Sequence, residues 1–255
     1  MAINWSGINS RSATGQLFRL PLRLLPARLV VPILAGPNRG LRWRVGACDH
    51  GCWLGSFEFE KQQRIRGRLR EGMSVFDIGA HVGFYTLVAS RAVGDSGKVF
   101  AFEPWPANVV DCLAHVRMNQ LDNVVVVPAA VGATTGLASF AAGESSSTGR
   151  LARVDTGVRV PCVTLDGLLA TGRFPVPDVI KVDVEGAELQ VLEGSQKLLR
   201  QHATTWFVAL HSFDQKSACL RLLGDAGYAI SSLNGASCDP YSPKAAPDEI
   251  IATRR

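Results

Sequence analysis

The chain has 255 residues, of which 47% are hydrophobic and 19% charged, and its formal net charge is +5. This length suits one well-buried domain and is short for two, and the composition excludes a disordered or fibrous protein. No uncharged apolar run reaches the roughly eighteen residues of a membrane span, and no cleavage site follows the apolar stretch 29–35. We therefore expect a cytoplasmic protein.

The positive charge belongs to the leading segment. Residues 1–72 contain 12 Lys and Arg against 4 Asp and Glu, whereas residues 73–255 contain 15 against 18. We predict a basic N-terminal extension over residues 1–45 and a single catalytic domain over residues 46–255. Such an extension can contact a membrane surface or an anionic substrate, although a solvated cationic face is the more ordinary interpretation. It shows neither aromatic platforms nor a recognition helix, so we expect no nucleic-acid partner.

From residue 74 onward, short apolar runs alternate with helical periods, which predicts parallel strands joined by crossover helices. The predicted strands are residues 74–78, 98–102, 124–127, 179–184, 206–210, 228–233 and 249–253. The predicted helices are residues 84–93, a segment that begins at Pro106, residues 187–201 and a segment around 219–226. The pattern breaks between residues 132 and 165, where we expect an inserted loop and a hairpin.

The first motif is DIGAHVG, residues 77–83, at the end of a predicted strand and directly before a helix. A glycine turn at a helix N-terminus lets main-chain N–H groups approach a ligand. A dinucleotide pyrophosphate would be repelled by the carboxylate of Asp77. S-adenosylmethionine instead offers an ammonium group that Asp77 can bind directly or through water, while Gly79 and Gly83 permit close approach. The motif therefore favours S-adenosylmethionine as the cofactor.

The second motif is Phe102-Glu103-Pro104, at the end of the next predicted strand. Glu103 follows Asp77 by 26 residues, near the offset at which nucleotide-binding α/β folds place an acid on the ribose. Its carboxylate can accept hydrogen bonds from both ribose hydroxyls, and Pro104 or Trp105 can cover the adenine. Glu103 alone is weak evidence, because many strands end in an acid, but Glu103 after Asp77 in this order is specific.

The third motif is KVDVEGAE, residues 181–188, at the carboxyl end of a predicted parallel strand, where ligand crevices open in this architecture. Asp183 can orient a hydroxyl acceptor or bind a cation, and Glu185 can share that work. Glu188 can simply cap the following helix, and capping can also account for Asp183 and Glu185. The sequence alone assigns no metal site.

The segments FDIGAHVGFYTLVASR, AFEPWPANVV, VVVVPAAVGATTG and PDVIKVDVEGAELQVLEG together resemble the FkbM family of methyltransferases, over roughly residues 58–212. The resemblance implies an α/β fold, a doubly wound Rossmann-like sheet of seven strands with an antiparallel last strand. It also implies S-adenosylmethionine as donor and a hydroxyl oxygen as acceptor, on a sugar, a glycan or glycolipid, or a polyketide. By motif, Asp77, Gly79, Ala80, His81 and Gly83 would hold the methionine end, Glu103, Pro104 and Trp105 the nucleoside, and Asp183 and Glu185 would face the acceptor.

Two histidines depart from the family pattern. His81 stands where relatives commonly have Asn, and we expect it to order the glycine turn. His211 stands at a strand end where relatives often have an acid. A histidine with a reference pKa near 6.5 suits a base that takes the proton of an acceptor hydroxyl, and a purely structural His211 is an equal alternative.

Two other functions compete with a methyltransferase. A nicotinamide-dependent oxidoreductase uses a related sheet, but Asp77 in the glycine turn argues against it. A non-catalytic binding protein can retain the nucleotide pocket, although the intact set of Asp77, Glu103 and Asp183 argues against lost activity. The acceptor, the oligomeric state and any metal requirement stay open.

Overall fold

The computed structural model describes residues 22, 25–141, 150–151, 158–211, 213–242 and 247–254. Five strands run parallel at its centre: β3 (Ser74–Ile78), β4 (Lys98–Phe102), β5 (Val124–Val127), β10 (Val179–Val182) and β11 (Thr205–Ala209). The antiparallel β14 (Glu249–Thr253) lies between β11 and β12 (Ala229–Ser232), and the order β12-β14-β11-β10-β3-β4-β5 confirms the predicted doubly wound sheet. A two-residue strand, β13 (Ser237–Cys238), adds an eighth strand at the β12 edge.

The central strands are apolar on both faces because helices cover both. Along β3, Phe76 and Ile78 join one core cluster, while Val75, directly before Phe76, joins the other. The same alternation places Phe207 of β11 on the face opposite to Trp206. Side chains that alternate between two covered faces give the continuous apolar runs by which these strands are recognised in the sequence.

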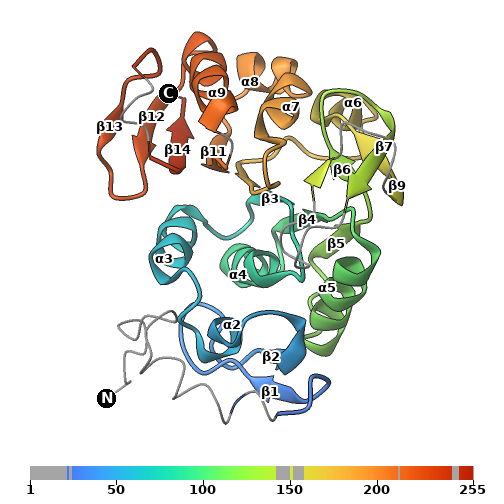
Figure 1. Ribbon diagram of the computed structural model, residues 1–255. Helices are drawn as coiled ribbons and strands as arrows, with labels where there is room; N and C mark the ends of the chain where they lie inside the picture. Colours follow the sequence, from blue (N-terminus) through green and yellow to red (C-terminus); the bar gives the residue numbers. More distant parts are fainter. Residues whose placement is uncertain are drawn as a thin grey trace.

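Figure 1 shows the two helical layers on either side of the sheet. One layer contains α3 (Phe59–Arg68), α4 (Phe84–Val93) and α5 (Pro106–Met118), and the other contains α6 (Leu165–Ala170), α7 (Glu188–Glu193), α8 (Gln196–Gln201) and α9 (Phe213–Asp225). The single helix predicted over residues 187–201 is divided into α7 and α8. Helix α7 ends before Gly194, where a Cβ would lie 2.1 Å from the carbonyl oxygen of Gly132. The helix is therefore interrupted where two main-chain segments come into close contact.

The insertion after β5 forms a second, smaller sheet. Its strands are β6 (Ala130–Val131), β7 (Gly136–Ala141), β8 (Arg150–Leu151) and β9 (Val158–Val163), in the order β6-β9-β7-β8. Strand β7 pairs antiparallel with β8 and with β9, so the predicted hairpin is present. The predicted loop falls on residues 142–149, which lie outside the described residues.

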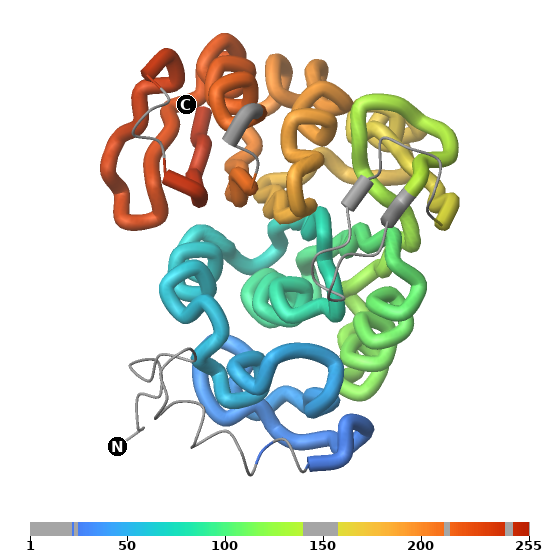
Figure 2. Tube along the Cα trace, in the orientation of Figure 1, coloured from blue at the N-terminus to red at the C-terminus, as the bar shows by residue number. Residues whose placement is uncertain are grey.

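The described part of the basic leading segment packs against the domain. Strands β1 (Val30–Pro32) and β2 (Arg42–Arg44) pair, and η3 (Val45–Ala47) and α2 (His50–Leu54) follow them beneath α4 and α5 (Figure 2). Trp43 is 0% exposed, and its ring stacks on His115 of α5 with the centroids 3.9 Å apart. Arg44 forms an ion pair with Asp111 of the same helix. Strands β1 and β2 are therefore part of the fold, although the sequence analysis assigned them to the N-terminal extension. For the residues that precede β1, a separate extension stays a prediction.

Among the helices of the described residues, none combines the length and the apolar character that a membrane crossing needs.

Candidate active site

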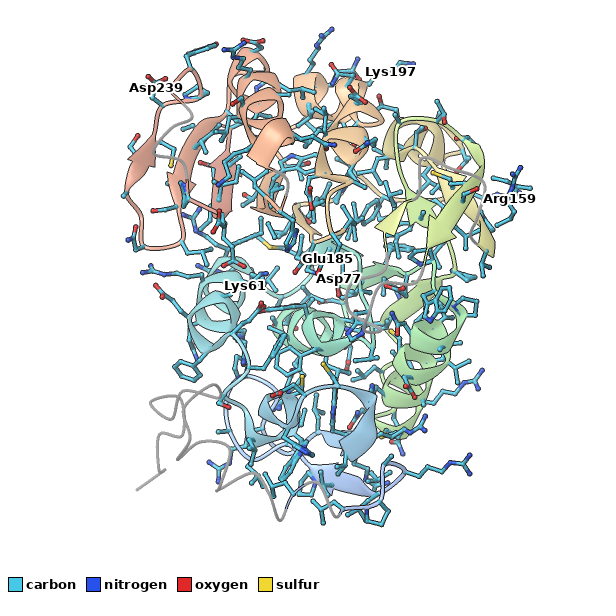
Figure 3. The ribbon with its side chains drawn as sticks, in the orientation of Figure 1. Lys61, Asp77, Arg159, Glu185, Lys197 and Asp239 are labelled. Carbon is cyan, nitrogen blue, oxygen red and sulfur yellow. The ribbon has the colours of Figure 1, made fainter. Side chains whose placement is uncertain are left out.

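A cavity of about 170 Å³ opens at the carboxyl ends of β3, β10 and β11. Three of the labelled side chains, Lys61, Asp77 and Glu185, gather in this central region of the molecule (Figure 3). The lining residues are Cys48, Cys52, Phe57, Glu58, Lys61, Gly79, Ala80, His81, Phe84, Tyr85, Lys181, Asp183, Glu185, His211 and Glu249. The structure therefore brings the glycine turn of the first motif together with Asp183, Glu185 and His211, although more than a hundred residues separate them.

The glycine turn is shaped by close approach of the chain to itself. Gly79 has φ 74°, and a Cβ there would lie 1.9 Å from the carbonyl oxygen of Asp183. Gly83 has φ 91°, precedes α4, and has space limited by Cys112 Sγ, which would lie 2.9 Å from a Cβ. The glycines thus let the turn after β3 lie against the end of β10 and against α5.

A hydrogen bond connects His81 in the glycine turn to Glu103, which directly follows β4. The main-chain N–H of His81, a residue with φ 51°, donates to Glu103 Oε2 at 2.8 Å. Glu103 Oε1 accepts from Trp105 N at 2.9 Å and Asn108 Nδ2 at 3.2 Å. Glu103 is 5% exposed, and its carboxylate is thereby fixed beside the turn. The Trp105 side chain, predicted to cover an adenine, packs partly buried against the small sheet.

Asp77 lies beneath the turn and does not line the cavity. It is 1% exposed, and Oδ2 accepts from Thr86 Oγ1 at 2.7 Å. Oδ1 lies 3.2 Å from Lys181 Nζ as an ion pair, yet it has no hydrogen-bond partner among the described residues. A buried carboxylate oxygen that is ion-paired but accepts no hydrogen bond can still accept one from a donor ammonium or from water. Because Asp77 is covered, the water-mediated form of that contact suits the geometry better than the direct one.

Lys61, which no sequence motif identifies, connects three acidic residues at the crevice. Its Nζ lies 2.6 Å from Glu249 Oε1, 3.1 Å from Asp183 Oδ2 and 3.4 Å from Glu58 Oε2. The side chain is 6% exposed, and burial opposes its charge, but the three carboxylates outweigh that effect and raise the pKa of Lys61. Lys61 is therefore a fixed cation that ties α3 to the ends of β10 and β14.

Asp183 lies between this cation and Lys181. Lys181 Nζ donates to Gly79 O at 2.8 Å and lies 3.8 Å from Asp183 Oδ2. Burial alone would raise the pKa of Asp183, but the two ammonium groups outweigh it and lower the pKa to about 2. Asp183 is thus an ionised, firmly placed carboxylate and a weak base.

His211 is oriented by Glu188. Its Nδ1 donates to Glu188 Oε1 at 2.9 Å, and its Nε2 lies 3.5 Å from Asp183 Oδ1. Glu188 is 1% exposed and also accepts the Gly186 N–H at 2.9 Å. The hydrogen bond to Glu188 raises the pKa of His211 to about 9. The reference pKa near 6.5 therefore does not apply to His211, and Glu188 has a role besides capping α7.

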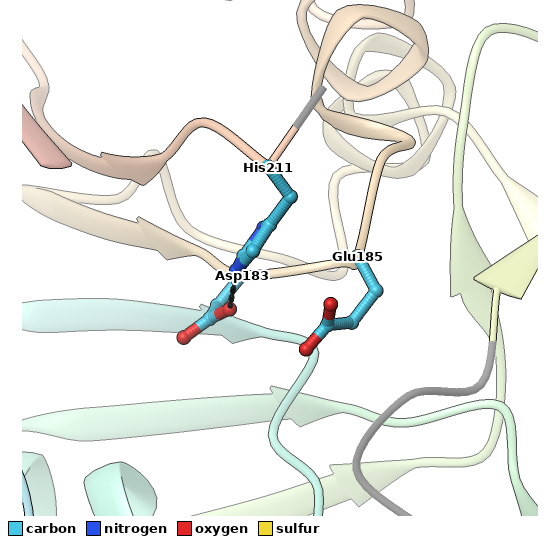
Figure 4. A group of neighbouring side chains, drawn as sticks. All are labelled: Asp183, Glu185 and His211. Carbon is cyan, nitrogen blue, oxygen red and sulfur yellow. Dashed lines mark ion pairs between the residues drawn. The ribbon is translucent and has the colours of Figure 1, made fainter. Parts of the chain in front are cut away.

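Glu185 lies in the same part of the crevice as Asp183 and His211. Its main chain takes a left-handed conformation, with φ 52°, in the turn between β10 and α7. The carboxylate lies beside Asp183 and His211 (Figure 4), and burial raises its pKa. One donor atom from each of these three residues lies within 4.8 Å of the other two, a set that can hold a metal ion.

Cys48 and Cys52 also face this cavity. A hydrogen bond from the Cys52 thiol is the main cause that lowers the pKa of Cys48 to about 5, and His81 adds to it. The two thiols are free cysteines. Cys48 is therefore a thiolate beside the glycine turn.

Residues 77–230 match the methyltransferase FkbM domain, which is more than half of the chain. The protein belongs to the FkbM methyltransferase family. It is 28% identical to the hexuronic acid methyltransferase AglP of Haloferax volcanii over 163 residues, which cover 63% of this chain and 66% of AglP.

Among solved structures, the fold is similar to that of the methyltransferase FkbM from Methylobacillus flagellatus KT, with a TM-score of 0.50 and 19% identity. That match covers 73% of this chain and 45% of the other, so the chain spans under half of that relative and just under two thirds of AglP. The family match supports methyl transfer and does not favour an oxidoreductase.

Proposed function

We propose that the protein transfers a methyl group from S-adenosylmethionine to a hydroxyl oxygen of a sugar, with a uronic-acid-containing saccharide as the acceptor class. The observation that carries the proposal is the juxtaposition of the Gly79 turn with Asp183 and His211 in one crevice. AglP is a hexuronic acid methyltransferase, which narrows the proposed acceptor class. A glycan, glycolipid or polyketide hydroxyl is the broader class from which this one is chosen.

The donor end of the site is built from the first two motifs. S-adenosylmethionine supplies, when bound, a methyl group activated by a sulfonium. Asp77 Oδ1 is the buried oxygen that its ammonium can satisfy, and Glu103 is held by three N–H groups beside the turn, where the ribose is expected. The carboxylate-rich crevice also favours a cationic donor over an anionic dinucleotide.

The acceptor end is built from the third motif and His211. Asp183 is fixed by Lys61 and Lys181, so its Oδ1 can position a hydroxyl without moving. Methyl transfer to an alcohol needs in-line alignment and removal of the hydroxyl proton at some stage. With Asp183 ionised at low pH and His211 carrying a proton at neutral pH, orientation is the larger contribution of these side chains.

Only some of the arginines of the basic leading segment are available to bind an acceptor. Arg44 is already paired with Asp111, and residues 1–21 lie outside the described residues. We propose that the remaining arginines attract an anionic acceptor or its membrane carrier, and cytoplasmic localisation stays a prediction.

The test is transfer of labelled methyl from S-adenosylmethionine to oligosaccharides that end in a hexuronic acid. Matched oligosaccharides that end in the corresponding neutral hexose are the control, because they keep the hydroxyls and lack the carboxylate. We expect label on a hydroxyl of the uronic acid, located by fragmentation of the product. Label on the carboxylate as an ester, or label on none of the saccharides although the donor binds, would contradict the proposed acceptor.

A further inference from the structure

Three side chains from two strand ends converge in the crevice (Figure 4). Asp183 and Glu185 follow β10, His211 follows β11, and one donor atom of each lies within 4.8 Å of the others. We propose that Asp183, Glu185 and His211 bind a divalent first-row cation such as Mn²⁺. Its role in positioning the acceptor rests on the proposed function, whereas the binding itself does not.

His211 is already arranged as a metal ligand. Histidines that bind metals usually donate the second ring N–H to a carboxylate, which fixes the ring and aims the other nitrogen at the ion. Glu188 Oε1 accepts from Nδ1 at 2.9 Å, and the buried Glu188 is itself held by the Gly186 N–H. The other nitrogen, Nε2, consequently points toward Asp183 Oδ1 at 3.5 Å, and a metal ion that binds there replaces its proton.

The two oxygens of Asp183 have different neighbours. Oδ2 faces the ammonium groups of Lys61 at 3.1 Å and Lys181 at 3.8 Å, whereas Oδ1 faces His211. A carboxylate can be held through one oxygen and coordinate an ion through the other. The lysines therefore fix Asp183 without occupying the oxygen that the cation would use.

Glu185 is turned toward the same point by an unfavourable main chain. A left-handed conformation is unfavourable for a non-glycine residue, and here φ is 52°. Residues held in such conformations concentrate at ligand sites. A small rotation of this partly exposed side chain brings its oxygen to coordination distance, because the three donor atoms start within 4.8 Å.

The charge of the crevice also favours a cation. Glu58, Asp183 and Glu249 surround Lys61, and Asp77 adjoins Lys181, so two ammonium groups face four carboxylates before Glu185 and Glu188 are added. One imidazole and two carboxylates suit Mn²⁺, Fe²⁺ or Zn²⁺. Three protein ligands leave coordination positions open, and these face the cavity in which the acceptor hydroxyl must lie.

Mn²⁺ binding to the full chain, freed of metal by chelator, tests this site without any methyl acceptor. Loss of the six-line electron paramagnetic resonance signal of free Mn²⁺ measures binding. We expect one saturable site. Glu185→Gln should weaken it at least tenfold, and Glu188→Gln, which removes only the outer partner of His211, by about 10- to 100-fold. The matched control is Glu60→Gln, an exposed carboxylate on α3 that does not line the cavity, with an expected change of less than about threefold.

The proposal is overturned if Glu185→Gln and Glu188→Gln both leave Mn²⁺ binding unchanged. It is also overturned if the wild type shows no binding below about 1 mM Mn²⁺. Binding of S-adenosylhomocysteine, measured by calorimetry on each variant, reports whether the fold and the donor site are intact. If Glu188→Gln does not fold, Glu185→Gln, at a partly exposed position, decides alone. If Mn²⁺ does not bind but methyl transfer is normal, the cation site is rejected and the proposed function stands. If Mn²⁺ binds but the methyl donor does not, the cation site stands and the proposed function is rejected.

Discussion

The carbonyl oxygen of Asp183 occupies the space that a side chain on Gly79 would need. A Cβ at Gly79 would lie 1.9 Å from that oxygen, in a turn with φ 74°. Gly79→Ala should therefore push the donor turn away from the end of β10. We expect the free energy of unfolding to fall by clearly more than the roughly 1–2 kcal/mol that a left-handed conformation costs alanine, as measured by urea denaturation.

Gly172→Ala is the matched control for this substitution. Gly172 has a similar φ, 68°, and no described atom lies within 4 Å of its Cβ position. Gly172→Ala should lower the free energy of unfolding only by the cost of the left-handed conformation, about 1–2 kcal/mol. Equal losses in the two variants would mean that the Gly79 turn and β10 are not in close contact.

Asp183→Asn should separate the acceptor side from the donor side. The substitution keeps the size of the side chain and removes the charge that faces Lys61 and Lys181. We expect turnover to fall by about 10²- to 10⁴-fold while donor affinity changes little, as shown by single-turnover rates and calorimetry. Asp225→Asn, on α9 and exposed, should match the wild type. Normal turnover in Asp183→Asn would reduce Asp183 to a structural residue.

The cysteines allow a prediction about pH. With a pKa of about 5, Cys48 is a thiolate throughout neutral pH, whereas burial raises the pKa of Cys112 and Cys219 to about 12. Iodoacetamide should alkylate Cys48 first, at a rate that changes little between pH 7 and 8.5. An ordinary thiol gains about tenfold over that interval. Peptide mapping by mass spectrometry gives the site and the rate.

S-adenosylhomocysteine should slow this alkylation, because Cys48 lines the cavity. Cys238, which is partly exposed and has a raised pKa, is the internal control and should stay slow with or without ligand. A Cys48 rate that climbs with pH as an ordinary thiol does would contradict the thiolate.

The central sheet could be predicted because its strands are covered on both faces. Val179–Val182 is buried at every position, as expected for a strand of a parallel sheet that is covered on both faces. Val124–Val127 is as apolar but forms the edge strand β5, where Val125 is 46% exposed, so the expectation that both of its faces are covered was wrong. The turn at Gly79 and the acid Glu103 could be predicted for a similar reason, since the ends of parallel strands meet at one edge.

The cations of the site could not be predicted in this way. Lys61 belongs to a polar helix, α3, whose mean composition gives no sign that this lysine is buried, and its partners are Asp183 and Glu249, far along the chain. The contact between His211 and Glu188 depends on how α7 packs beside the end of β11. These relationships arise from tertiary packing, which a pattern along one strand or helix does not contain.

The buried His115 predicts how stability depends on pH. Burial against Trp43 lowers the pKa of His115 to about 4, so the folded state resists protonation while the unfolded chain takes up a proton near pH 6.5. Stability should therefore be complete above about pH 6.5 and decline toward pH 4, by about 3 kcal/mol from this residue. Urea unfolding at pH 7 and pH 4.5 measures the decline, and His115→Gln should show a smaller one. An equal decline in both proteins would exclude His115 as its source.

The central claim is that the crevice beside Gly79 and Glu103 binds the methyl donor. Glu103 is fixed by His81, Trp105 and Asn108, so its carboxylate is available to ribose hydroxyls in one orientation. Calorimetric titration of the wild type with S-adenosylhomocysteine, and of Glu103→Ala, tests this directly. We expect one site in the wild type and a loss of about 1–3 kcal/mol in Glu103→Ala. The exposed Glu60→Ala, on α3, should bind as the wild type does, and NAD should give no heat. Unchanged affinity in a folded Glu103→Ala, or saturable binding of NAD in place of S-adenosylhomocysteine, would contradict the assignment.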